Sequence, residues 1–118
     1  MASPPSLQKR FIGLDIHKHY LIATGVDAEL IQVLGLQRVE MPRLGAWMRK
    51  ALRPTDEVVI EMTTNTWQLH DDLLPHVRSV TVVHPPHVAL ITRSQVMNDK
   101  IASLILARLL AKGLLVSI

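Results

Sequence analysis

The stretch Phe11-Ile12-Gly13-Leu14-Asp15-Ile16-His17 decides the fold of this chain. Every second side chain in its interior is aliphatic: Ile12, Leu14 and Ile16. This period of two predicts a β-strand with one strongly apolar face, and it places Asp15 on the opposite face. An acidic side chain inside so apolar a strand is unusual, so Asp15 is the first candidate for a functional role.

Two further β-prone segments follow this strand closely. Residues 21–26 and 31–39 are rich in aliphatic side chains, and Asp27-Ala28-Glu29 separates them. Because only short turns connect the three segments, we expect a three-stranded antiparallel meander. A helix is expected next, since Pro42 suits a first helical turn and apolar residues then recur at helical spacing until Pro54. The recurring residues are Leu44, Trp47, Met48, Ala51 and Leu52.

The second half of the chain predicts strands that alternate with helices. Residues 58–60 form a continuous apolar run, typical of a strand covered on both faces, and the run ends on Glu61. Residues 79–84 form another β-branched run. One helix is expected between these strands, and a last one over residues 99–112, which Gly113 ends. The pattern as a whole predicts an α/β fold with a mixed sheet, in which the meander precedes alternating helices and strands.

Capping residues mark the starts of these two helices. Asn65 is expected to cap the first, with Gln68 at the third position of a capping box. Its buried side is expected to carry Trp67, Leu74 and Val77. Asn98 is expected to cap the last helix, whereas residues 87–97 show no clear pattern.

Length and composition limit the molecule to one domain. The chain has 118 residues, of which 48% are hydrophobic, and we expect a disordered lead-in over residues 1–9 and one domain over residues 10–118. No apolar run reaches the roughly 18 residues that cross a bilayer, and the amino terminus lacks a secretory hydrophobic segment, so we expect a soluble cytoplasmic protein without a membrane. Residues 114–118 resemble the start of another element, which suggests a fragment of a longer protein.

Charge and cysteine content narrow the chemistry. A net charge of +3 with neutral histidines gives a mild preference for anionic partners such as nucleic acid. Cysteine is absent, which excludes thiolate zinc sites and cysteine nucleophiles. Any metal ion must therefore be held by oxygen or imidazole ligands.

Three acidic residues are candidates for a divalent-metal site. Asp15 lies in the first strand, Glu61 ends the fourth, and Asp99 opens the last helix. Sites in α/β sheets form beyond the carboxyl ends of strands, and carboxylates gathered there suit Mg²⁺ or Mn²⁺ in phosphoryl transfer. Each acid also has a simpler explanation, since Asp99 alone would complement a helix dipole. Like charges about 4 Å apart repel by roughly 4 kcal/mol at an effective dielectric constant of 20, so a fold has little reason to gather all three without a cation.

The other polar and aromatic residues point less clearly to a site. The histidines lack the spacing of a zinc motif, although His17 is placed to hydrogen-bond near Asp15. The basic face of the first helix is expected to be solvated; it carries Arg43, Arg49, Lys50 and Arg53. Trp47 and Trp67 occupy core-like positions, so neither is expected to stack on a nucleobase.

Four segments occur in an order that is familiar from one family. They are Gly13-Leu14-Asp15-Ile16-His17-Lys18, Glu61-Met62-Thr63 followed by Trp67, Val82-Val83-His84-Pro85, and Asn98-Asp99-Lys100-Ile101 followed by Leu106-Ala107-Arg108-Leu109-Leu110. Together they resemble the amino-terminal RuvC-like domain of DEDD insertion-sequence transposases, which include Piv-type DNA invertases and bridge-RNA-guided recombinases. The resemblance covers about residues 10 to 115.

The resemblance implies a ribonuclease-H-like fold and divalent-metal-dependent DNA strand cleavage and transfer. The family's acidic set is Asp, Glu, Asp, Asp, and its first three members fall on Asp15, Glu61 and Asp99. The fourth falls on Ala102, which has no ligand atom, so the resemblance implies an incomplete catalytic site and an inactive chain. It also implies DNA and guide (bridge) RNA as partners in a homo-oligomer. The family's carboxy-terminal domain with its nucleophilic serine has no counterpart here.

Two other functions remain open from the sequence. The same scaffold would serve as a non-catalytic nucleic-acid-binding or dimerisation module. An actin-like nucleotide phosphotransferase also begins with a strand that carries Gly-x-Asp, but that class has small and hydroxyl residues after the aspartate. Here His17-Lys18-His19-Tyr20 follow it.

Overall fold

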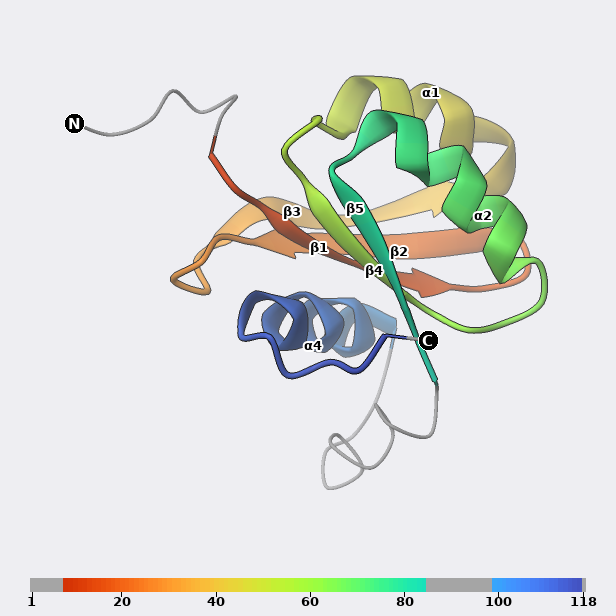
Figure 1. Ribbon diagram of the computed structural model, residues 1–118. Coiled ribbons are helices and arrows are strands. Elements are labelled where there is room, and N and C mark those ends of the chain that lie inside the picture. Colours follow the sequence, from red (N-terminus) through yellow and green to blue (C-terminus); the bar gives the residue numbers. More distant parts are fainter. Residues whose placement is uncertain (1–7, 85–98, 118) are drawn as a thin grey trace.

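The computed structural model describes residues 8–84 and 99–117. In these ranges the chain forms a five-stranded mixed sheet and three α-helices, which confirms the predicted α/β class (Figure 1). The strands are β1 (Phe11–Ile16), β2 (Tyr20–Val26), β3 (Gln32–Glu40), β4 (Glu57–Glu61) and β5 (Ser79–Val83). The helices are α1 (Leu44–Ala51), α2 (Thr66–Leu73) and α4 (Asp99–Ala111), with short 3₁₀ turns at Met41–Arg43 and Leu74–His76.

The strands follow the order β3-β2-β1-β4-β5 across the sheet. The first three strands pair antiparallel, as the short turns between them predict. Strand β4 pairs parallel to β1, and β5 pairs parallel to β4. A parallel pair needs a long crossover connection, and α1 and α2 lie in the two connections that lead into β4 and β5. The sheet is therefore an antiparallel meander joined to a parallel half.

The alternation along β1 divides the core into two layers. Ile12 and Leu14 face a large cluster that includes Met48 of α1 and Leu73 of α2. Phe11, on the other face, packs against α4. Accordingly α1 and α2 cover one face of the sheet and α4 covers the other (Figure 1).

Helix α4 packs directly on the backbone of β1 at Gly13. A Cβ atom on Gly13 would lie 2.1 Å from the carbonyl oxygen of Ser103 and 2.8 Å from the amide nitrogen of Ala107. Only glycine permits so close an approach of a helix to a strand. Beside it, the buried hydroxyl groups of Thr24 and Ser103 form a hydrogen bond of 2.7 Å, so the polar groups at this contact are satisfied.

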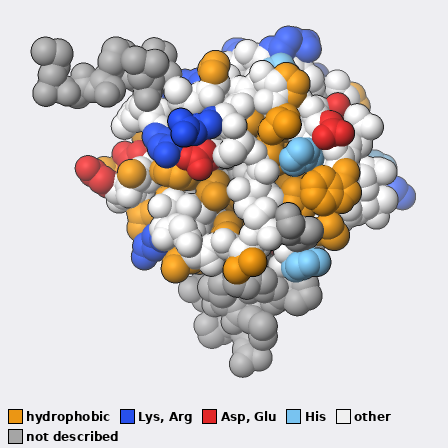
Figure 2. Space-filling model, viewed as in Figure 1, with side chains coloured by type: hydrophobic (Ala, Val, Ile, Leu, Met, Phe, Trp, Pro, Cys, Tyr) orange, Lys and Arg blue, Asp and Glu red, His pale blue; other side chains and the backbone are white. Residues whose placement is uncertain are grey.

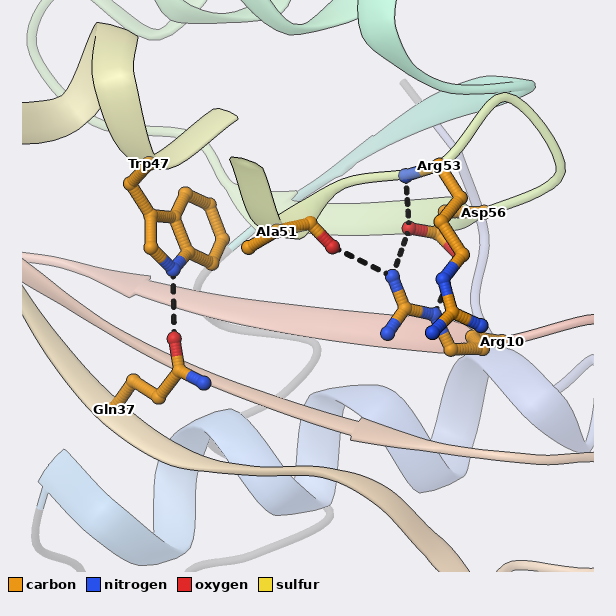
Figure 3. A network of polar contacts seen from close by, with 6 residues as sticks. All are labelled: Arg10, Gln37, Trp47, Ala51, Arg53 and Asp56. Carbon is orange, nitrogen blue, oxygen red and sulfur yellow. Dashed lines mark hydrogen bonds and ion pairs between the residues drawn. The ribbon is translucent and has the colours of Figure 1, made fainter. Parts of the chain in front are cut away.

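A buried ion pair fixes the amino ends of β1 and β4. The guanidinium group of Arg10 donates to both carboxylate oxygens of Asp56, at 2.8 and 2.7 Å, and to the carbonyl oxygen of Ala51 at 2.8 Å (Figure 3). The backbone amide of Arg53 donates to the same carboxylate at 2.8 Å. Both charged side chains are buried, and this network ties the end of α1 to the sheet.

Helix α1 agrees with its predicted pattern. Leu44, Met48 and Leu52 are buried, while Trp47 is half-buried against the core. The indole Nε1 of Trp47 donates to Oε1 of Gln37 at 2.7 Å (Figure 3). The basic residues Arg43, Arg49 and Lys50 are exposed, as expected for a solvated face, whereas Arg53 lies beyond the end of α1 and is half-buried.

The predicted buried face of α2 is wrong for two of its three residues, Trp67 and Leu74. Leu69 and Leu73 face the core, whereas Trp67 is 50% exposed and Leu74 is 44% exposed. Figure 2 shows hydrophobic side chains and a histidine gathered on the surface over α2. One reason is that α2 ends at Leu73, so Leu74 does not extend its helical stripe. Val77 lies beyond the helix but is buried in the same core cluster, as predicted.

The predicted capping box of α2 is also absent. Asn65 occupies the N-cap position, but its backbone is left-handed, with φ of 64°, and its side chain makes no capping bond. Instead, the hydroxyl group of Thr66 accepts the amide of Thr63 and donates to that residue's carbonyl oxygen. The side chain of Gln68 bonds to Asp72 rather than back to the cap. Of the other expectations, the cap at Asn98, the unassigned segment at residues 87–97 and most of the lead-in lie outside the described residues.

Candidate metal and nucleic-acid site

Asp15 and Glu61 come together on neighbouring strands. In the parallel pair of β1 and β4, Leu14 lies opposite Ile60, and Asp15 and Glu61 are the next residues in register. Side chains that share a register position in paired strands point to the same face. That face is the one covered by α4, since Gly13 and Val59, two residues earlier, both contact this helix. The sequence prediction that the two acids meet at the carboxyl ends of their strands is therefore supported by the register.

The proximity of the two acids is visible in the pKa of Glu61. Partial burial raises the pKa of this carboxyl above its ordinary value, and the negative charge of Asp15 raises it further. Both causes penalise the ionised form of Glu61. A cation bound between the two side chains would remove the second cause and offset the first.

His17 fixes the other side of the Asp15 carboxylate. Its Nε2 atom lies 2.9 Å from Oδ2 of Asp15, which confirms the expected contact between these residues. The imidazole stacks on the ring of Tyr20, with centroids 4.5 Å apart, and the guanidinium group of Arg38 lies 3.7 Å from the centre of that ring. This stack of His17, Tyr20 and Arg38 restricts the orientation of the imidazole and hence of the Asp15 carboxylate that it contacts.

The start of α4 lies at the same end of the sheet. Ala107 packs near Phe11, and Ser103 lies against Gly13, so α4 runs antiparallel to β1. From Ser103 back to Asp99 the helix rises about 6 Å, and from Gly13 to Asp15 the strand rises roughly 7 Å. The backbone of Asp99 is thereby brought level with Asp15. The side chain of Asp99 lies outside the described part of the chain.

Ala102, at the position of the family's fourth acid, is buried with an exposure of 6%. It lies one helical turn before Leu106, which packs against Val59 of β4 and Val83 of β5. Within the described residues no group of three or more metal-ligating side chains gathers. Two carboxylates on adjacent strands, with mutual repulsion, fit a hard divalent cation in ligand type, but they form only part of a coordination shell.

A pocket of about 560 Å³ opens at the same edge of the sheet, on the face that α1 and α2 cover, whereas the acidic pair lies on the face that α4 covers. His17 lines the pocket and also contacts Asp15, so it links the pocket to the acidic pair around the edge of the sheet. The sequence did not predict this pocket. One feature of the sequence could have indicated the pocket. It is the run of hydroxyl and amide side chains at residues 63–66, shortly after Glu61. His19 and His84 are exposed, and His87 lies outside the described residues.

No protein-family model matches the chain, and no curated protein matches it significantly. Among the helices that the structure describes, none has both the length and the apolar character required to cross a bilayer. The function must therefore be argued from the site itself.

Proposed function

We propose that this chain is the ribonuclease-H-like, RuvC-like domain of a DEDD transposase or recombinase. In this proposal Asp15, Glu61 and Asp99 hold a divalent cation that acts on a DNA phosphodiester. The observation that carries it is the position of Asp15 and Glu61 directly after the last paired residues, Leu14 and Ile60, at the carboxyl ends of two adjacent parallel strands, where the charge of Asp15 acts on Glu61.

The sheet topology supports the same proposal. A ribonuclease-H-like sheet has an antiparallel meander whose first strand is central, followed by parallel strands on its other side, and the order β3-β2-β1-β4-β5 is compatible with that arrangement. The central strand of this sheet carries the first acid of the resemblance, and its parallel neighbour carries the second. The helix that begins with the third acid packs on the same face.

The residues have separate roles in this scheme. Asp15 and Glu61 would be ligands of Mg²⁺ or Mn²⁺, and the contact with His17 would orient the Asp15 carboxylate. A bound cation of this kind supplies activation of an attacking oxygen and stabilisation of the leaving oxygen in phosphoryl transfer. Because Ala102 offers no ligand atom, we expect weak cation binding and no strand cleavage by the chain as it stands.

Manganese binding tests this proposal. Paramagnetic broadening of amide NMR signals by Mn²⁺ is expected around residues 15 and 61 of the unaltered chain, and Asp15→Asn should abolish it. Ala102→Asp should bind Mn²⁺ about tenfold more tightly, because it adds a carboxylate beside the pair. Ala102→Asn is the matched control, since it has nearly the same size and no charge. Equal affinity of the two variants, or broadening that survives Asp15→Asn, would contradict the proposal.

The absence of a carboxylate at Ala102 favours a second candidate, a non-catalytic nucleic-acid-binding or dimerisation module on the same scaffold. A nucleic-acid-binding module would bind DNA or RNA without a divalent cation, and its affinity would fall as salt rises. Asp15→Asn would leave that affinity intact. Guide RNA and a second copy of the chain remain proposed partners on this account.

A further inference from the structure

The pocket at this edge of the sheet is formed where three connections converge. Its walls come from the β1–β2 turn, the start of α1 and the start of α2, and its volume of about 560 Å³ lies within the roughly 300–1,000 Å³ of small-molecule sites. The lining residues used below are Leu44, Leu69, Lys18, Thr64, Gln68 and Asp72. All of them belong to the described part of the chain.

The pocket has an apolar interior and a polar rim. Leu44 and Leu69 are buried residues of the core cluster and form part of its floor. On the rim, Nε2 of Gln68 donates to Oδ1 of Asp72 at 3.0 Å, which holds the amide group and leaves its oxygen available as an acceptor. A flat, partly apolar group with hydrogen-bonding edges, such as a nucleobase, matches this lining.

Charge on the rim favours an anionic group on one side. Lys18 is exposed, and in the described ranges no carboxylate pairs with its ammonium group. Arg43 is exposed between Met41 and Leu44, which both line the pocket. The one acidic rim residue, Asp72, lies on α2, so a phosphate would be directed to the Lys18 side.

We infer that this pocket receives one nucleotide of the DNA strand, with its base in the apolar interior and its phosphate beside Lys18. The inference rests on the proposed function, because the DNA strand that the acidic pair addresses would continue around the edge of the sheet into this pocket. The contact of His17 with both the pocket and Asp15 provides the continuity between them. The pocket would thus position the strand without itself contacting the cation.

Titration with single-stranded DNA in EDTA tests this inference separately from the metal site. The probe is a hexamer of thymidylate, followed by amide NMR shifts of the full chain. We expect shifts at residues 16–18 and 63–69, and an affinity that falls with salt. Gln68→Trp, a bulky substitution at an exposed position, should weaken binding at least tenfold, and Lys18→Gln should weaken it several-fold. Thr64→Trp serves as a second filling variant.

The matched control is Lys50→Gln, which removes the same charge from an exposed position on α1 that does not line the pocket. Its affinity should stay within about twofold of the unaltered chain. Shifts confined to the basic face of α1, or undiminished binding by both filling variants, would overturn the inference. Since no cation is present, a failure here leaves the manganese result standing, and a failure of manganese binding leaves this result standing.

Discussion

At the scale of single residues, the candidate site keeps two like charges close together, which lowers the stability of the fold. Glu61 is partly buried, and its neighbour Asp15 has the same charge, so its pKa is raised in the folded protein. A carboxyl whose pKa is higher in the folded state than in the unfolded state binds more protons when folded. Stability is therefore expected to fall as pH rises from the ordinary pKa of 4.5 through the raised value.

The prediction is that Glu61→Gln stabilises the chain at pH 7 by about 0.5–1 kcal/mol, because it removes a partly desolvated charge next to another. The gain should disappear near pH 4, where Glu61 is protonated. Urea unfolding at the two pH values measures it. Glu57→Gln is the control at the other end of β4, where the carboxylate pairs with Lys9 at 2.9 Å, and it should give no gain. A loss of stability in Glu61→Gln at pH 7 would show that the carboxylate is satisfied within the protein.

At the scale of elements, the contact between β1 and α4 depends on one missing side chain. Gly13→Ala is predicted to destabilise the chain by at least about 2 kcal/mol, since the new methyl group would meet the backbone of α4 at Ser103. Gly35→Ala, in β3, is the matched control, because nothing lies within 4 Å of a Cβ there. Thermal unfolding followed by circular dichroism measures both. Similar melting temperatures for the two variants would mean that α4 moves away from the sheet at little cost.

The sequence predicted the elements better than it predicted their faces. Strand β1 was predicted because Ile12 and Leu14 alternate with other residues, and a period of two leaves only two faces to choose between. Helix α2 was harder, because Trp67 and Leu74 are apolar and spaced for a helix, yet the helix ends before Leu74. The spacing of apolar residues does not show where a helix must end so that the chain can turn towards its next strand.

The candidate site was partly predictable for the same physical reason. An acid in an apolar strand, Asp15, is visible in the sequence, and so is an acid at the end of a buried run, Glu61. Their adjacency follows from strand order, which short turns and a helical crossover restrict. The pocket was not predictable, because its walls come from three connections whose relative placement depends on packing.

At the scale of the whole molecule, charged residues at the two ends of the sheet have opposite effects on stability. The amino ends of β1 and β4 are joined by the buried pair of Arg10 and Asp56, in which the charges are paired and hydrogen-bonded. The carboxyl ends carry Asp15 and Glu61, whose charges repel. The domain unfolds as one cooperative unit, so both ends contribute to the same free energy of unfolding. The stabilising ion pair at one end therefore offsets the destabilising repulsion at the other.

This division predicts a large loss of stability when the ion pair of Arg10 and Asp56 is broken. Asp56→Ala should destabilise the chain by about 3–5 kcal/mol, because it leaves the Arg10 guanidinium group buried without its counter-ion. The double variant Arg10→Met with Asp56→Asn should lose less, since it buries no unpaired charge and keeps an acceptor for the amide of Arg53. Urea unfolding measures the free energy of unfolding of the unaltered chain, of Asp56→Ala and of the double variant. Glu29→Ala, which replaces an exposed acid, is the control, and its free energy of unfolding should stay within about 0.5 kcal/mol of the unaltered chain. A double variant less stable than Asp56→Ala would place the stabilisation in the hydrogen bond of Arg10 to Ala51 and not in the ion pair.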